Sequence, residues 1–478
     1  MWRGDAVEAL LARTVDVLDP GDLPPPGGRA SGSGARSSGD GPSPADLEAD
    51  LAAAGLPAGS AILLAMPNGK ALLATFFAVL RAGLTPVPVP PGAGTARLTA
   101  IAASCGAAGV ITRLTTRAGD TPGPGGPQQA APGETPRRLV EISRFAGTPR
   151  SYPNGSVIIT TSGTSGIATG CVHHIDRLLR NATRHADAVG QRPGDTLLVT
   201  LPMYFSYALV AQCLAALARD SHLIISGPPF TVRHYARTLE RHHVTISSLT
   251  PVLVRRLLAE GLTLPRGLRA LTIGGDHLPP ELVAPLLGVV PGGELYLTYG
   301  LTEAGPRVST LAAHAEPGRR HGSAGLPLPG VRTSLRPSTL ADGTRELLVH
   351  TDTAMLERVP EGKPRPDGSI ATGDLFDIDG DGYHWFRGRI SDSVTVNGEK
   401  VWLPSVRTLA AGLAGVRRAV TRVHRDGADT HYDLEIYVDE PGPGQDRAYH
   451  RELSRHLLRA ERPRAVIVQP YAEEGWHK

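Results

Sequence analysis

Residues 157–170 read VIITTSGTSGIATG, an apolar run of β-type residues followed at once by a loop of glycine, serine and threonine. Glycines let a backbone approach an oxygen-rich ligand, and hydroxyl and backbone N–H groups can donate to phosphate oxygens. The stretch therefore predicts a strand that leads into a phosphate-binding loop. A flexible linker is the alternative that these residues alone leave open.

The loop has no lysine. Thr169-Gly170 is followed by Cys171, whereas a P-loop has a lysine directly after the second of two glycines that flank four residues. We therefore do not expect a Walker-type ATPase.

The chain around the loop alternates between apolar runs and helical patterns. The expected strands are 157–161, 196–201, 222–226, 244–248, 268–273 and 294–298. The expected helices are 173–189, 207–218, 230–241, 250–260 and 279–288. Such alternation predicts right-handed βαβ units in a parallel, doubly wound sheet. Ligands bind at the carboxyl ends of such strands, where the loop after Thr161 and the turn after Thr298 would both lie.

The other segments indicate how the chain is divided. Residues 1–20 predict an amphipathic helix, and the segments 20–45 and 114–137, rich in Pro and Gly, predict mobile loops. We expect a large domain, residues 1–389, and a small mobile C-terminal domain, residues 390–478. The expected fold class is α/β, with doubly wound, mostly parallel sheets and a distorted β-barrel-like part in the large domain and an α+β small domain.

Composition excludes several classes of protein. A length of 478 residues implies at least two domains. Lys and Arg number 49 against 46 Asp and Glu, which predicts no nucleic-acid or membrane partner. Cys105, Cys171 and Cys213 form no disulfide or zinc pattern. Without a signal peptide or a long apolar run, we expect a cytoplasmic protein.

Four further motifs join the glycine-rich loop. They are Gly274-Gly275-Asp276, Tyr299-Gly300-Leu301-Thr302-Glu303, Thr372-Gly373-Asp374, and Gly388-Arg389 with Asn397-Gly398-Glu399. In this order and spacing, residues 45–478 resemble the adenylate-forming superfamily of acyl- and aryl-CoA synthetases, luciferases and nonribosomal peptide synthetase adenylation domains.

The resemblance implies binding of ATP and Mg²⁺ and a role for each motif. Tyr299 would stack on adenine, Thr302 would donate to the α-phosphate, and Glu303 would hold the metal ion. Asp374 would accept hydrogen bonds from both ribose hydroxyls, and Arg389 would reach the ribose and phosphates. The other implied cofactor-binding residues are Thr161, Ser162, Gly163, Thr164, Ser165 and Gly166 of the loop, with Gly275 and Asp276.

The end of the chain would supply the remaining catalytic group. Counting from the apolar strand that ends at Val468, the superfamily's late catalytic lysine corresponds to Lys478, the last residue of the sequence. A frayed terminus is the alternative for that residue. Ser391 stands where the superfamily usually has its hinge Asp or Lys.

Three departures concern the phosphates and the acyl acceptor. Thr169 replaces the loop lysine of most relatives, which predicts weaker ATP binding or slower pyrophosphate release, unless a cation such as Arg180 compensates. Thr395 and Asn397 stand where coumarate-type ligases often have lysines. The acceptor could therefore be coenzyme A, the phosphopantetheine thiol of an acyl- or peptidyl-carrier protein, or an amine.

The segment Leu201–Leu209 resembles the part of these enzymes that lines the acyl pocket. Phe205 replaces a frequent histidine, and the implied pocket residues are Phe205, Tyr207, Ala211 and Gly300. An α-amino acid is disfavoured, because no Asp lies between Asp195 and Asp220 to pair with its ammonium group. A flat aromatic acid or a short aliphatic acid fits such a pocket.

The sequence therefore predicts an ATP-dependent ligase that adenylates a small carboxylic acid. Two alternatives remain open. One is a degenerate nucleotide-binding relative without activity, and the other is an enzyme of the same fold that activates a nitrogen substrate such as nitrite.

Overall fold

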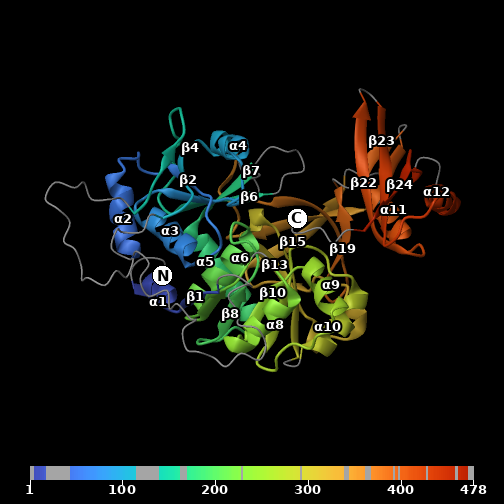
Figure 1. The fold of residues 1–478 in the computed structure, drawn as a ribbon, viewed down its shortest axis with the longest axis horizontal. Coiled ribbons are helices and arrows are strands. Elements are labelled where there is room, and N and C mark those ends of the chain that lie inside the picture. Colours follow the sequence, from blue (N-terminus) through green and yellow to red (C-terminus); the bar gives the residue numbers. More distant parts are fainter. Residues whose placement is uncertain are drawn as a thin grey trace. The chain divides into compact units, whose positions relative to one another are not determined.

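The computed structural model describes residues 5–17, 43–114, 139–161, 169–227, 230–290, 293–338, 344–360, 368–390, 393–396, 399–426, 429–457 and 461–471. These residues form two compact units (Figure 1). The first unit comprises residues 1–333 and 349–370, and the second comprises 334–348 and 371–478. The predicted boundary between residues 389 and 390 stays a prediction.

An eight-stranded sheet dominates the first unit, in the order β1-β9-β8-β10-β11-β12-β13-β14. Its strands are β1 (Thr14–Asp16), β8 (Thr196–Val199), β9 (His222–Ile225), β10 (Ile246–Leu249), β11 (Ala270–Ile273), β12 (Glu294–Gly300), β13 (Arg307–Ala312) and β14 (Leu326–Pro327). In this order, each pair of neighbouring strands from β1 through to β12 is parallel. The last two strands, β13 and β14, are added antiparallel. The predicted parallel α/β architecture is confirmed.

The helices between these strands follow the predicted order. They are α5 (Ile175–Ala188), α6 (Ser206–Ala208), the π-helix η2 (Leu209–Leu214), α7 (Ala215–Ala218), α8 (Val232–Arg241), α9 (Pro251–Ala259), and the 3₁₀ turn η3 (Pro280–Leu282) with α10 (Val283–Val289). Within the described residues, no helix has both the length and the apolar character to cross a bilayer.

The predicted place of strand 157–161 in the parallel sheet is wrong. β6 (Ser156–Thr161) pairs antiparallel with β7 (Thr169–His174), and β17 (Glu357–Val359) pairs antiparallel with β7 to complete a separate three-stranded sheet. A connection of seven residues can join antiparallel neighbours, but a parallel crossover needs a dozen or more residues. The glycine-rich segment therefore links the two strands of a hairpin, and α5 begins only at Ile175.

The N-terminal part of the first unit contains a second sheet. Its order is β3-β2-β4-β5, with β2 (Ala61–Leu64), β3 (Thr85–Pro88), β4 (Ala107–Ile111) and β5 (Ser143–Arg144). Its helices are α2 (Pro44–Ala53), α3 (Lys70–Arg81) and α4 (Thr95–Cys105). The helix expected over residues 1–20 is shorter, because α1 (Asp5–Ala12) ends before β1 joins the edge of the large sheet beside β9. Most of segments 20–45 and 114–137 lies outside the described residues.

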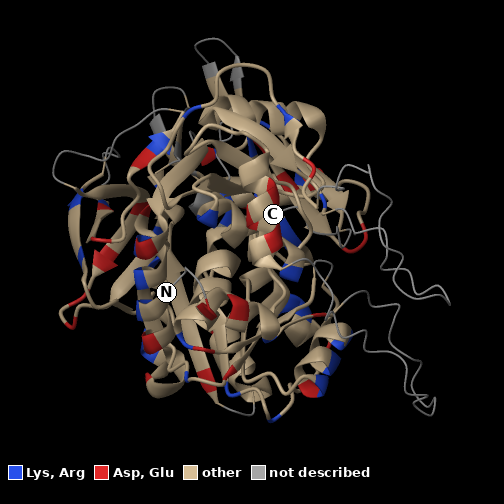
Figure 2. Ribbon diagram, turned by 90° about the vertical axis from the view of Figure 1, so that its left-hand side faces the viewer, with Lys and Arg blue, Asp and Glu red and all other residues tan. Residues whose placement is uncertain are grey.

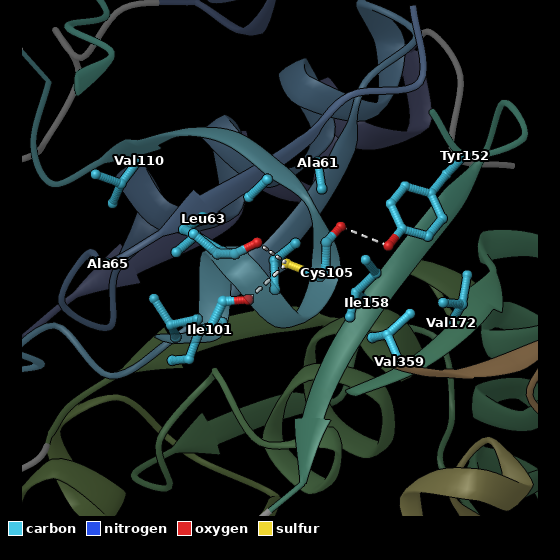
Figure 3. Packing of buried hydrophobic residues seen from close by; sticks show 14 residues of the cluster. Ala61, Leu63, Ala65, Ile101, Cys105, Val110, Tyr152, Ile158, Val172 and Val359 are labelled. Carbon is cyan, nitrogen blue, oxygen red and sulfur yellow. Dashed lines mark hydrogen bonds between the residues drawn. The ribbon is translucent and has the colours of Figure 1, made fainter. Parts of the chain in front are cut away.

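The hairpin is anchored on the core of the second sheet (Figure 3). Ile158 of β6, Val172 of β7 and Val359 of β17 belong to one buried cluster with Leu63 of β2 and Cys105 of α4. The hairpin is thus held by apolar packing, and β17 is fixed beside it.

The second unit contains most of a four-stranded sheet and an α+β tail. The sheet has the order β15-β16-β18-β19, with β15 (Val331–Pro337), β16 (Arg345–Thr351), β18 (Ile370–Ile378) and β19 (His384–Arg389). The tail contains β20 (Ser393–Val396), β21 (Glu399–Trp402), α11 (Leu403–Ala411), β22 (Val416–Asp426), β23 (Asp429–Val438), α12 (Gln445–His456) and β24 (Val466–Pro470). Basic and acidic residues are intermixed along the ribbon (Figure 2).

Candidate adenylation site

The carboxyl ends of β11 and β12 bring two of the predicted motifs together. The strands are parallel neighbours with Ile273 opposite Leu297, so Gly274-Gly275 and the Tyr299–Glu303 segment leave the sheet at the same edge. Gly275 has a φ of +87°, which favours glycine, and Asp276 is exposed, with Oδ1 accepting from the His277 amide at 2.8 Å. Of the two loops expected to meet here, the turn after Thr298 lies at this edge, and the loop after Thr161 lies outside the described residues.

A tight turn presents Thr302 and Glu303. β12 ends at Gly300, and the 3₁₀ turn η4 (Thr302–Ala304) follows. A Cβ atom at Gly300 would lie 2.3 Å from the Pro306 carbonyl oxygen, so only glycine fits there. Tyr299 is half-buried and is the last residue but one of β12.

Thr302 is held from two sides. His173 of β7 donates from Nε2 to the Thr302 carbonyl oxygen at 2.9 Å, and burial lowers the pKa of His173 to about 4, so the imidazole is neutral near pH 7. Ser206 Oγ lies 3.2 Å from Thr302 Oγ1. Two partly exposed hydroxyl groups therefore stand together at the end of the sheet, a pair of donors suited to phosphate oxygens.

Glu303 forms an ion pair that the sequence did not reveal. Its carboxylate, 15% exposed, pairs with Arg358, which β17 places opposite Cys171 of β7. The Glu303 carbonyl also accepts from the Met355 amide at 2.8 Å. The described residues contain no cluster of three metal-ligating side chains, so Glu303 would be a single protein ligand.

At the predicted phosphate loop, the structure describes the residues on either side, Thr161 and Thr169. Thr161 Oγ1 and Thr169 Oγ1 are 2.7 Å apart, so the residue that replaces the usual lysine is tied to the opposite strand. Ser162, Gly163, Thr164, Ser165 and Gly166 lie outside the described residues, as do Lys478, Ser391 and Asn397. Arg180 forms an ion pair with Asp352 at 3.1 Å.

The predicted acyl-pocket residues separate into two environments. Phe205 is 40% exposed, whereas Tyr207 and Ala211 are buried on α6 and η2. The Tyr207 hydroxyl lies 2.9 Å from Thr272 Oγ1 of β11. The guanidinium of Arg307 lies over the Tyr207 ring, 4.5 Å from its centroid.

The second unit brings Asp374 and Arg389 together. They are opposite residues of β18 and β19, and Arg389 Nε lies 2.8 Å from Asp374 Oδ1. Asp374 is buried, and its backbone N–H donates to Thr372 Oγ1 at 3.0 Å. Glu346 accepts from the Gly373 amide at 2.8 Å, which fixes the Thr-Gly-Asp turn.

Reasoning from the sequence missed Arg307, Arg358, His173 and Ser206. Arg307 had a signal, since a basic residue begins the β-type run RVSTLA, with three residues between it and the end of the Tyr-Gly-Leu-Thr-Glu motif. Arg358 had none, because its position depends on the pairing of β17 with β7.

Known proteins resemble this chain in sequence and in fold. The profile of the family described as AMP-binding enzyme matches residues 49–343. The chain is 26% identical to a 3-hydroxybenzoate–CoA ligase of Aromatoleum sp. (strain CIB) over 63% of this chain and 60% of that protein. It is 29% identical to a fatty acid–[acyl-carrier-protein] ligase of Streptomyces coeruleorubidus over 59% and 57%. These alignments span about three fifths of each relative.

The fold also matches solved structures. The o-succinylbenzoate CoA synthetase of Bacillus subtilis, in complex with its acyl-adenylate intermediate, superposes with a TM-score of 0.70 at 18% identity, over 89% of this chain and 88% of that one. The family profile covers more than half of the chain, from α2 to the segment before β16. The chain therefore belongs to the family of AMP-binding enzymes.

Proposed function

We propose that this chain is an ATP-dependent acid ligase. It joins a small carboxylic acid to AMP with release of pyrophosphate and then transfers the acyl group to a thiol or an amine. The observation that carries the proposal is the convergence of Gly274 and the Thr302 turn at one edge of the sheet, with Ser206 Oγ 3.2 Å from Thr302 Oγ1. Membership of the AMP-binding family supports the same reaction.

Each described motif residue has a task in this proposal. Thr302 donates to the α-phosphate, and Tyr299 stacks on adenine. Asp374 accepts from the ribose hydroxyls, and its ion pair with Arg389 orients the carboxylate. Neutral His173 holds the Thr302 backbone, so the turn does not shift when a negatively charged substrate binds.

Mg²⁺ fits the site only together with ATP. Magnesium is usually held by one or two carboxylates and by substrate phosphates, and Glu303 offers one carboxylate. When bound, the ion would neutralise charge that develops on the phosphates. Because Arg358 already pairs with Glu303, we expect that contact to weaken when the ion binds.

The acceptor is a thiol in our proposal, either of coenzyme A or of a carrier-protein phosphopantetheine. The two relatives, one a coenzyme A ligase and the other an acyl-carrier-protein ligase, support both choices. We also propose that residues 390–478 form the small domain that rotates between the two half-reactions, that Lys478 is the catalytic lysine, and that the reaction takes place in the cytoplasm.

The alternative function is that of a degenerate nucleotide-binding protein without ligase activity, and two features of the site favour it. Thr169 lacks a charge, and Arg358 neutralises the carboxylate of the metal-ligand candidate. A pyrophosphate-release assay with ATP, Mg²⁺ and panels of aromatic and aliphatic acids, with hydroxylamine to trap the adenylate, separates the two. We expect acid-dependent pyrophosphate and a hydroxamate. Tight ATP binding in calorimetry without either product would favour the alternative.

A further inference from the structure

A buried arginine begins β13 beside the predicted acyl pocket. Arg307 is 3% exposed, and its guanidinium lies over the ring of Tyr207. A Cβ atom at Gly300 would lie 3.2 Å from Arg307 Cζ, and one at Gly274 would lie 3.0 Å from Arg307 Nη1. The guanidinium therefore occupies the space that two glycines leave open at the ends of β11 and β12.

The surroundings provide this cation with little compensation. Arg307 Nη1 donates to Thr298 Oγ1 at 2.8 Å, while Nε is buried without a hydrogen-bond partner. No Asp or Glu in the described part of the chain forms an ion pair with it. Arg269, another arginine near this sheet, pairs instead with both Asp195 and Glu294.

An uncompensated buried charge is costly. Arginine stays protonated in proteins, so burial lowers the pKa of Arg307 without removing its charge. The Tyr207 ring offers a cation–π contact, but a neutral ring does not replace a counter-ion. The site therefore contains a buried positive charge that a bound anion would neutralise.

Strand geometry places this charge away from the nucleotide. Side chains alternate between the two faces of a strand, so Thr298, which holds Arg307, points away from the face of Tyr299. Tyr299 is the residue assigned to adenine, whereas Tyr207 and Gly300 are assigned to the acyl group. An anion at Arg307 would accordingly be part of the acyl substrate and not a phosphate of ATP.

We propose that the acid activated by this enzyme carries a second anionic group, a carboxylate, which binds to the guanidinium of Arg307. The inference rests on the proposed ligase function and adds the substrate class. The first carboxylate reacts near Thr302, and the second is held at the far end of the pocket by two N–H donors. Because the guanidinium and the Tyr207 ring fill this region, the spacer between the two carboxylates is short.

The test compares acids that differ only in the second carboxylate. The pairs are propanoate with malonate, butanoate with succinate, and benzoate with phthalate, assayed by pyrophosphate release. We expect wild-type kcat/KM for at least one diacid to exceed that of its partner by about tenfold or more. Arg307→Met, which keeps side-chain bulk, should abolish this preference mainly through KM for the acid, while KM for ATP is unchanged. Arg307→Lys should restore part of it.

Controls separate binding from structure. Arg241→Met removes an exposed cation at the end of α8 and should leave the preference unchanged. The inference is overturned if the wild-type enzyme prefers the monoacids, or if Arg307→Met lowers kcat/KM equally for both members of every pair. The second result would mean that Arg307 only supports the fold.

A binding measurement keeps the inference separate from the ligase proposal. The melting temperature is recorded with ATP and each acid, for wild type and Arg307→Met. If no acid gives pyrophosphate but diacids alone raise the melting temperature of wild type and not of the variant, the ligase proposal fails and the anion site stands. If diacids stabilise neither protein more than monoacids do, the anion site is rejected.

Discussion

The Glu303 carboxylate already has a counter-ion within the fold. Its partner Arg358 comes from β17, a strand 54 residues farther along the chain, counted from Glu303 to Glu357. The pair gives a partly buried carboxylate a counter-charge in the absence of a metal ion. The position of Arg358 on β17 also places a cation next to β7. That strand begins with Thr169, the residue that replaces the lysine of most relatives.

Replacing Glu303 with alanine should slow adenylation by at least about tenfold, or about 1.4 kcal/mol of transition-state stabilisation, because the metal ion loses its protein ligand. Pyrophosphate release at saturating ATP measures the effect. Glu281→Ala, at an exposed position of the same unit, is the control and should keep the wild-type rate. Equal rates for Glu303→Ala and wild type would refute the metal assignment.

Restoring the loop cation should strengthen ATP binding. One charge-assisted hydrogen bond contributes about 1.5–3 kcal/mol, so Thr169→Lys is expected to lower KM for ATP by about tenfold or more. Thr169→Met removes the same hydroxyl without adding charge, and it should not lower KM. If both variants behave alike, Arg358 or another cation already fills the role of the missing lysine.

The sequence identified residues that belong to short motifs and missed those that depend on packing. Thr302 and Asp374 could be proposed as site residues because their neighbours in sequence are distinctive, and the structure places Asp374 opposite Arg389. Arg307 and Arg358 lie outside the motifs. Their contacts arise from the register of β13 with β12 and from the pairing of β17 with β7, neither of which a local pattern encodes.

The β6–β7 hairpin and β17 form the three-stranded sheet that carries the predicted phosphate loop. Gly170 of β7 lies opposite Val359 of β17, and a Cβ atom there would lie 2.7 Å from Ile158 Cγ2 and 3.1 Å from Val359 Cγ2. β17 can approach β7 only because residue 170 has no side chain.

Gly170→Val should therefore displace β17 and break the Arg358–Glu303 contact. Overpacking a tight core typically costs about 1–3 kcal/mol, so we expect a lower melting temperature together with a lower adenylation rate. Gly267→Val is the matched control, since a Cβ atom at Gly267 meets nothing within 4 Å. A Gly170→Val protein with wild-type stability and rate would show that this close packing is not needed.

The elements of the large sheet were predictable and the hairpin was not. Strands β8 to β12 follow a repeated alternation with helices, which specifies a parallel sheet. The run 169–174 reads TGCVHH, too polar to be recognised as a strand, so its pairing with β6 was not predicted.

At the scale of the molecule, buried histidines make the first unit sensitive to acid. Burial lowers the pKa of His173 to about 4 and, with the nearby Arg307 charge as a smaller cause, that of His185 to about 3. Both values lie below the ordinary value of about 6.5. As the pH falls from about 6.5 toward 4, these histidines bind protons in the unfolded chain but stay neutral in the folded unit. The free energy of unfolding therefore decreases.

His185→Gln should reduce this pH dependence. Removing one such histidine lowers the slope by about 1.4 kcal/mol per pH unit between the two pKa values. Urea unfolding at pH 7 and pH 5 measures it, with the exposed His222→Gln as control. If His185→Gln and His222→Gln lose the same stability between the two pH values, the histidine account is wrong.

The central claim is that a carboxylate oxygen attacks the α-phosphorus of ATP. The most direct test uses acids labelled with ¹⁸O in the carboxylate, with ATP, Mg²⁺ and coenzyme A or hydroxylamine as acceptor, followed by mass spectrometry of the AMP. The acids are benzoate, butanoate and succinate. Because the acceptor attacks the carbonyl carbon and AMP leaves with the bridging oxygen, AMP should carry one ¹⁸O. Acid-dependent AMP without the label, or no AMP with any acid, would contradict it.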